Sequence, residues 1–178
     1  MCLLLGPNGV GKTLLLKRLQ NYASKNSFTE MEDVPATIPT VGTNLANINI
    51  NKRKELTVRE LGGTMAPIWP SYFSDASIII FVIDASNRVQ ISAACIELLS
   101  VLSAKPLQQA SVLILLNKID MPRTMKLGEL KYLLRLEDLQ RTAPQPITVL
   151  ETSARNGQGL SEVVRWLAEN TKGSNNGS

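Results

Sequence analysis

The first residues of the chain whose types and spacing could do chemistry are GPNGVGKT, from Gly6 to Thr13. They match the pattern G-x-x-x-x-G-K-[ST] in full, between an apolar run and a leucine-rich segment. Glycine lets the backbone turn tightly enough for successive N–H groups to converge on phosphate oxygens, and a helix beginning near Lys12 would add its positive dipole end. Lys12 would pair with the β- and γ-phosphates of a nucleotide, and the hydroxyl of Thr13 would bind Mg²⁺. The predicted phosphate-binding residues are Asn8, Gly9, Val10, Gly11, Lys12 and Thr13.

A second motif, Asn117-Lys118-Ile119-Asp120, follows an apolar run and has the chemistry to select a base. The carboxylate of Asp120 can accept two hydrogen bonds from the N1 and 2-amino groups of guanine, which adenine cannot offer as a pair. The amide of Asn117 can reach the other edge of the base, and the stem of Lys118 can lie over it. Such polar pairing discriminates strongly, because the wrong base leaves buried groups unpaired. The two motifs together predict GTP and GDP as ligands.

A third group, TSARNG at residues 152–157, follows the last apolar run. The backbone N–H of Ala154 could bind the 6-oxygen of guanine, and Ser153 stands beside it. By itself this segment cannot be distinguished from a serine-containing turn. Its assignment to the base site therefore depends on the two motifs above.

The elements that must position these motifs follow from the apolar pattern. The runs at residues 78–84 and 111–117 are continuously apolar, which is typical of strands covered on both faces. Residues 91–102 and 160–168 have helical spacing. We therefore expect a P-loop NTPase fold of the α/β class: a mostly parallel six-stranded sheet with helices on both faces and ligands at the carboxyl ends of its strands. The expected strands are residues 1–5, 44–50, 56–60, 78–84, 111–117 and 147–151.

The connections between these elements differ in character. Residues 24–39 are polar and contain two prolines, which predicts a long mobile loop of the kind that is usually functional. The charged turn 51–54 joins two strands in a hairpin. After Gly63 we expect a second flexible stretch, in which Trp69 packs into the core. Residues 122–136 are expected to form a charged surface section with one short helix.

Length and composition exclude several classes of function. The 178 residues suit one domain, which we place at residues 1–172, followed by a disordered tail at 173–178. The formal charge of +4 marks no dense basic patch, so nucleic acid is not an expected partner. The chain has no histidine, which excludes His-based zinc sites and Ser-His-Asp triads. With two cysteines and no apolar run long enough to span a bilayer, we expect a cytoplasmic monomer that meets membranes only indirectly, if at all.

These residues together resemble the small GTPases of the Ras superfamily, over residues 1 to about 170. The segment PTVGTN at residues 39–44 is similar to the first switch of the ADP-ribosylation factor (Arf) and Arf-like branch, and PIW at 67–69 with Tyr72 is similar to its second. The resemblance implies a small G domain, a GTP-dependent switch that docks effectors, an exchange factor and a GTPase-activating protein. It also implies that Thr40 binds Mg²⁺ and the γ-phosphate, and that the N–H of Gly63 senses the γ-phosphate.

Three positions depart from the Arf pattern. Glu60 stands where these relatives have aspartate, so its longer side chain must fold back, act differently through water or hold Mg²⁺ weakly. Thr64 stands where the family has a glutamine that orients the attacking water, and threonine is too short for that role. We therefore assign no catalytic residue and expect slow unassisted hydrolysis. Thr43 and Arg59 replace aromatic residues of the effector surface, so the effectors of ordinary Arf proteins are not assumed.

The familiar N-terminal amphipathic helix of Arf proteins is also missing from this sequence, which begins within the first expected strand. Either the protein meets membranes only through partners, or Met1 is not the native start. Two further functions stay open. One is a P-loop ATPase with Asp84 as a metal ligand, although the chain is short and lacks the L-S-G-G-Q signature. The other is a GTP-binding scaffold that does not hydrolyse its nucleotide, which Glu60 and Thr64 would suit.

Overall fold

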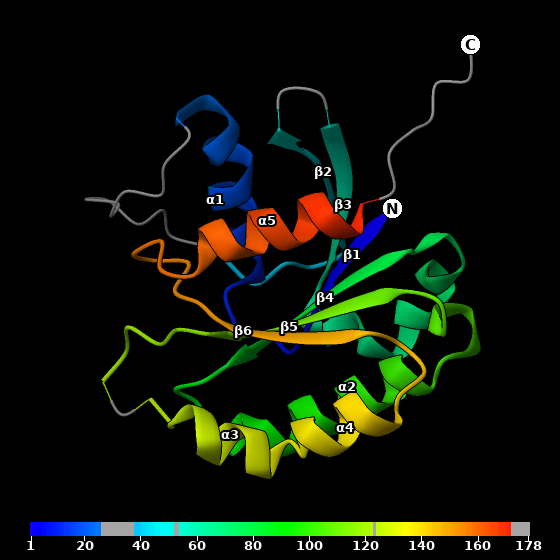
Figure 1. Cartoon of the computed structure of the whole chain (residues 1–178), viewed down its shortest axis with the longest axis vertical. Helices are drawn as coiled ribbons and strands as arrows, with labels where there is room; N and C mark the ends of the chain where they lie inside the picture. The colour runs from blue at the N-terminus through cyan, green and yellow to red at the C-terminus, as the bar shows by residue number, and fades with distance from the viewer. Residues whose placement is uncertain (26–37, 52–53, 123, 172–178) are drawn as a thin grey trace.

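A six-stranded sheet forms the centre of the molecule, with strand order β2-β3-β1-β4-β5-β6 (Figure 1). The computed structural model describes residues 1–25, 38–51, 54–122 and 124–171. All neighbouring strands pair in parallel except β2 and β3, which form the predicted antiparallel hairpin. The predicted mostly parallel six-stranded sheet is confirmed. Its strands are β1 (Cys2–Leu5), β2 (Thr43–Asn51), β3 (Lys54–Leu61), β4 (Ile78–Asp84), β5 (Ser111–Asn117) and β6 (Ile147–Glu151).

Helices cover both faces of the sheet (Figure 1). One face carries α1 (Lys12–Lys25) and α5 (Leu160–Asn170), and the other carries α2 (Ile91–Ser103), α3 (Leu127–Leu133) and α4 (Leu136–Thr142). Each face of the sheet has its own hydrophobic core. Successive side chains of a strand point to opposite faces, so β1 contributes to both cores: Leu3 packs on the face covered by α2, and Leu4 on the face covered by α1. The two short 3₁₀ helices η2 (Arg88–Gln90) and η3 (Lys105–Leu107) flank α2.

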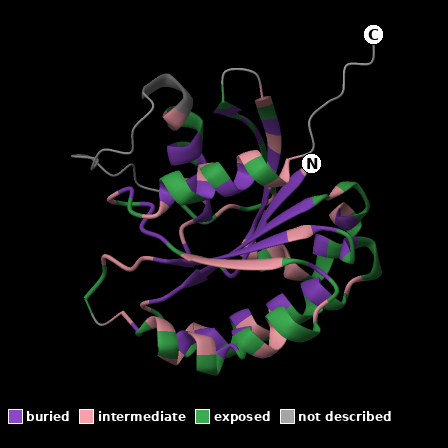
Figure 2. Ribbon diagram, in the orientation of Figure 1, coloured by how far each residue is buried: buried purple, intermediate pink, exposed green. Residues whose placement is uncertain are grey.

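The central strands are the most deeply buried part of the molecule. Every residue of β1 and β4 is buried, and β5 is buried from Val112 onward (Figure 2). A strand covered by helices on both faces has no solvent side, so its sequence is apolar without alternation. The edge strand β2 alternates buried Ala46, Ile48 and Ile50 with exposed residues. These patterns are the physical reason why the strands could be predicted closely.

Two connections are more ordered than the sequence predicted. Residues Gly63–Asp75 form a 3₁₀ helix, η1, and not a flexible stretch. Trp69 and Phe73 anchor it in the core: the indole N–H of Trp69 donates to the Gly62 carbonyl at 3.1 Å, and its ring meets Phe81 edge-on at 6.4 Å. The predicted core packing of Trp69 is confirmed. These contacts with residues outside the helix order a segment whose own two prolines disfavour an α-helix.

The charged section after β5 holds two short helices, α3 and α4, where one was expected. Arg135 separates them with a left-handed backbone, at φ 51°. Most of the predicted long loop at residues 24–39, the middle of the hairpin turn and the tail at residues 173–178 lie outside the described residues. Among the helices that the structure describes, none is long and apolar enough to cross a membrane.

Candidate functional site

The three sequence motifs meet at one edge of the sheet. The loop from Gly6 follows β1, the motif from Asn117 begins on the last residue of β5, and the segment from Thr152 follows β6. Because β1, β4, β5 and β6 are successive neighbours and run in parallel, their carboxyl ends open on the same side. This is the edge at which open α/β sheets bind ligands.

Close packing explains two glycines of the first loop. Gly6 has φ 138°, and a Cβ there would lie 2.3 Å from the carbonyl oxygen of Val82. Gly11 has φ 99°, and a Cβ there would lie 2.6 Å from the side-chain nitrogen of Asn117. Any larger residue would push the loop away from β4 or from the second motif. The loop then enters α1 at Lys12, so the free N–H groups of the first helical turn lie beside it.

Lys12 places a buried ammonium group at the centre of the loop. Its side chain is 5% exposed, and its Nζ donates to the carbonyl oxygens of Gly6 at 2.7 Å and Pro7 at 2.8 Å. Burial lowers the pKa of Lys12 from 10.5 to about 8, against the opposing charges of Glu60 and Glu97. Among the described residues Lys12 forms no ion pair. A phosphate group would supply the negative charge that this ammonium lacks.

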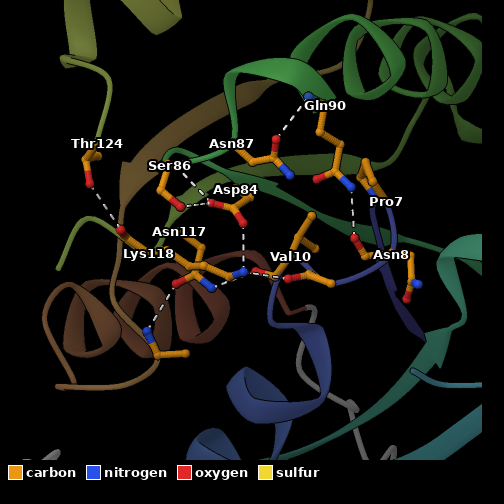
Figure 3. Close-up of polar contacts among 12 residues, drawn as sticks. Pro7, Asn8, Val10, Asp84, Ser86, Asn87, Gln90, Asn117, Lys118 and Thr124 are labelled. Atoms are coloured by element: carbon orange, nitrogen blue, oxygen red, sulfur yellow. Dashed lines mark hydrogen bonds and ion pairs between the residues drawn. The ribbon is translucent and has the colours of Figure 1, made fainter. Parts of the chain in front are cut away.

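Asn117 holds the three motifs together (Figure 3). Its side-chain N–H donates to the Val10 carbonyl at 2.9 Å, and its side-chain oxygen accepts from the backbone N–H of Ala154 at 3.1 Å and the hydroxyl of Thr152 at 3.2 Å. The residue is 1% exposed, so each bond is shielded from water. Both ends of the amide are engaged by protein groups; its expected contact with the base stays a prediction.

Lys118 spans from the second motif to the first loop (Figure 3). Its Nζ donates to the Gly9 carbonyl at 2.6 Å and pairs with the carboxylate of Asp84 at 2.7 Å. Asp84 is fixed in turn by the backbone N–H of Ser86 at 2.9 Å. These contacts stretch the aliphatic stem across the edge where a base could lie against it. The sequence alone suggested Asp84 only as a metal ligand of an ATPase. Its position as an acidic residue at the end of an apolar strand was the available indication that it belongs to the site.

The other predicted base-binding residues are also fixed by neighbours. Asp120 accepts a hydrogen bond from the hydroxyl of Ser153 at 2.6 Å, and that hydroxyl also accepts from the N–H of Asn156 at 3.1 Å. Ser153 therefore holds the Asp120 carboxylate in place. A further contact was not predicted at all: the side chain of Gln90, just before α2, donates to the Asn8 carbonyl at 2.9 Å (Figure 3). Nothing in the local sequence pairs residues so far apart.

Two hydroxyls and a carboxylate gather at the other end of the loop. The Oγ1 atoms of Thr13 and Thr40 lie 3.0 Å apart, and Oε1 of Glu60 lies 2.5 Å from the first and 3.2 Å from the second. Oxygen ligands at such spacing suit Mg²⁺. The described residues contain no cluster of three or more His, Cys, Asp or Glu side chains that could hold a metal. This corner therefore fits a cation only if phosphate or water supplies further oxygens.

The segment around Thr40 and the start of η1 approach each other and the phosphate loop closely. A Cβ at Gly62 would lie 2.2 Å from the Thr40 carbonyl oxygen, and one at Gly63 would lie 2.3 Å from the Asn8 nitrogen. A single pocket joins these parts. Its lining combines the phosphate loop, the threonine and glutamate oxygens and the lysine of the second motif: Asn8, Gly9, Gly11, Lys12, Thr13, Leu14, Ile38, Pro39, Thr40, Glu60, Gly63 and Lys118.

Comparison with known proteins gives one consistent result. The family model described as the ADP-ribosylation factor family matches residues 1–171. ADP-ribosylation factor-like protein 16 of Homo sapiens is 53% identical, over 94% of this chain and 84% of its own length. ADP-ribosylation factor-like protein 1 of Drosophila melanogaster is 35% identical, over 93% of this chain and 86% of its own.

Among solved structures, the Arl6 BBS3 small GTPase of Trypanosoma brucei, with the bound nucleotide analogue GppNp, superposes with a TM-score of 0.78. The match covers 94% of each chain at 21% sequence identity. At that identity the likeness shows the fold, which agrees with the sheet order and helix placement described above.

Proposed function

The chain belongs to the ADP-ribosylation factor family of small GTPases, and from that membership we propose that it is a GTP-dependent molecular switch. The observation that carries the proposal is the position of Asn117, whose amide bonds to Val10 and Ala154 and so joins the phosphate loop to both base motifs. A site assembled in this way holds phosphate groups at one end and a base at the other.

We assign each end of the nucleotide to its own residues. Lys12 and the backbone N–H groups of residues 8–13 bind the phosphates, because the ammonium is buried without an ionic partner in the described part of the chain. Asp120 accepts hydrogen bonds from the guanine edge while Ser153 keeps it oriented, and Lys118 covers the base. The N–H of Ala154 already donates to Asn117, so its contact with the 6-oxygen requires a shared hydrogen bond.

The threonine hydroxyls of Thr13 and Thr40 hold Mg²⁺ in this proposal. Their 3.0 Å separation is the spacing expected of two adjacent oxygen ligands of that ion. When bound, Mg²⁺ would neutralise charge on the β- and γ-phosphates. Thr13 belongs to the first turn of α1, whereas Thr40 lies outside any helix or strand, in the segment preceding β2. One ligand is therefore permanent and the other depends on the conformation of its segment.

Switching follows from the packing of the two segments that sense the γ-phosphate. Thr40 and Gly63 are coupled through Gly62. Gly62 lies close against the Thr40 carbonyl, and its backbone N–H donates a hydrogen bond to the Gly42 carbonyl at 3.0 Å. Loss of the γ-phosphate removes a ligand from both segments at once, and they rearrange together. We propose that effectors read this difference, that an exchange factor and a GTPase-activating protein drive the cycle, and that the protein acts as a cytoplasmic monomer.

Nucleotide selectivity tests the proposal. The purified protein, stripped with EDTA, is titrated with fluorescent GDP, GTP and ATP, each with and without Mg²⁺. We expect tight binding of both guanine nucleotides, strengthened by Mg²⁺, and weaker binding of ATP by at least about a hundredfold. Equal affinity for ATP and GTP would contradict the proposal and favour the P-loop ATPase.

A scaffold that binds GTP without hydrolysing it is favoured by one observation. Exposed Thr64 stands where the family has its water-orienting glutamine, and the chain has no histidine to replace it. Phosphate release over many turnovers, with and without cell extract, separates the two functions. If the protein is a switch, phosphate is released slowly and cell extract accelerates the release. If it is a scaffold, no phosphate is released with or without extract.

A further inference from the structure

Glu60 is a buried carboxylate at the end of β3 with an unusual set of neighbours. It is 1% exposed, and its backbone is held on both sides, opposite Leu4 of β1 and Asn44 of β2. Its Oε1 faces the hydroxyls of Thr13 and Thr40, and its Oε2 lies 3.5 Å from the amide nitrogen of Asn44. Every one of these partners is uncharged.

The charge of this carboxylate therefore lacks a counter-ion. Lys12 is near enough for its pKa to respond to Glu60, yet its ammonium donates to the carbonyls of Gly6 and Pro7 instead. Within the described part of the chain, Glu60 forms no ion pair. Burying a carboxylate without a positive partner is costly, so a site of this kind calls for a bound cation.

The spacing of the side-chain oxygens of Thr13, Thr40 and Glu60 indicates where that cation would lie. Adjacent ligands of an octahedral Mg²⁺, with metal–oxygen distances of about 2.0–2.1 Å, are separated by about 2.8–3.0 Å. The three oxygens of Thr13, Thr40 and Glu60 have mutual distances of 3.0, 2.5 and 3.2 Å, which bracket this value. They form a triangle with the dimensions of one octahedral face.

We infer that Glu60 is a direct ligand of Mg²⁺ and takes a position that a water molecule would otherwise fill. This inference rests on the proposed function, because the nucleotide must supply further ligands. Thr13 and Glu60 both belong to regular elements, α1 and β3, whereas Thr40 lies outside any helix or strand. The ion is therefore held by two protein ligands even after the Thr40 segment has moved away, and the GDP state keeps its metal.

Counting the water ligands of the metal tests the inference. Mn²⁺ replaces Mg²⁺ in the GDP complex of the full chain, because both ions favour octahedral oxygen sites. Line broadening in ¹⁷O-enriched water then gives the number of bound waters by electron paramagnetic resonance. We expect one water fewer in the wild type than in Glu60→Asp, whose shorter side chain withdraws its carboxylate. The control is Glu55→Asp, which shortens an exposed glutamate of the same strand and should leave the count unchanged.

A second measurement does not depend on any variant being stable. Wild-type protein labelled with ¹³C at its glutamate carboxyl groups should show a ¹³C hyperfine coupling to Mn²⁺ typical of a directly bound carboxylate. Its absence, or equal water counts in the wild type and Glu60→Asp, would overturn the inference. Affinity of the GDP complex for Mg²⁺ should also fall about tenfold or more in Glu60→Asp. If instead the wild type does not retain GDP at all, the proposed function itself fails.

Discussion

At the scale of single residues, the site depends on side chains whose polar groups bond to several segments at once. Asn117 donates one bond and accepts two, and all three reach segments that are far away in the sequence. A buried amide with this pattern cannot be replaced by an apolar side chain without leaving backbone groups unpaired. We therefore expect Asn117 to contribute both to stability and to the shape of the proposed nucleotide site.

Asn117→Ala should lower the free energy of unfolding by about 1–3 kcal/mol, because the Val10 carbonyl and the Ala154 N–H lose their partner in a buried site. It should also raise the dissociation rate of GDP. Chemical denaturation and release of fluorescent GDP measure the two effects. The matched control is Asn47→Ala, since Asn47 accepts its hydrogen bond from Thr57 on the surface. Indistinguishable effects of the two substitutions would refute the role given to Asn117.

Lys12 gives the site a pH dependence. Burial lowers the pKa of Lys12 from 10.5 to about 8 in the nucleotide-free protein, and phosphate would raise it again. Above about pH 8 part of the protein therefore holds a neutral Lys12 and must take up a proton when GDP binds, whereas at about pH 7 the uptake is small. Calorimetric titration in buffers of different ionisation enthalpy measures the uptake.

Exposed Lys17 lies in the same helix and provides the control for this prediction. Lys17→Met should leave the proton uptake unchanged. The interpretation fails if uptake is absent at about pH 8 in the wild type, or if it disappears in Lys17→Met.

At the scale of helices and strands, the burial of an element determined how closely the sequence could predict it. The central strands were predicted closely because their continuous apolar runs follow directly from cover on both faces. The order of η1 was missed, because it depends on Trp69 meeting Phe81 and Gly62 rather than on local propensity. In the same way the three site motifs could be predicted from their patterns, but the Lys118–Asp84 and Gln90–Asn8 contacts that hold them arise only from the tertiary fold.

The anchoring of η1 can be tested by removing the indole. Trp69→Ala should reduce the free energy of unfolding by about 3–5 kcal/mol, since it leaves a large cavity and removes one of the two hydrogen bonds to the Gly62 carbonyl, which keeps only its bond from the Met65 N–H. Ile68→Ala, which truncates a neighbouring side chain that is 48% exposed, should change it by less than about 1 kcal/mol. Hydrogen exchange across η1 should accelerate only in Trp69→Ala. Similar losses in both variants would mean that the aromatic contact does not order this element.

At the scale of the whole molecule, the site brings together loops that lie far apart in the sequence. Asn117 and Lys118 bond to Val10 and Gly9, which brings β5 to the phosphate loop. Ser153, after β6, then fixes Asp120. The nucleotide proposed for this edge of the sheet would contact loops that follow β1, β5 and β6. In the proposed function, phosphate binding and base selection therefore belong to one assembled edge of the sheet and not to any segment alone.

The most direct test of this account is the base preference of Asp120→Asn, measured as the affinity ratio for GDP and xanthosine diphosphate. An asparagine amide can donate to the 2-oxo group of xanthine, and its oxygen can still accept from Ser153, so we expect the preference to reverse by at least about a hundredfold. Asp75→Asn, at an exposed aspartate, should keep the wild-type preference for GDP. An Asp120→Asn protein that still selects GDP as strongly as the wild type would contradict the assignment of this edge as a guanine site.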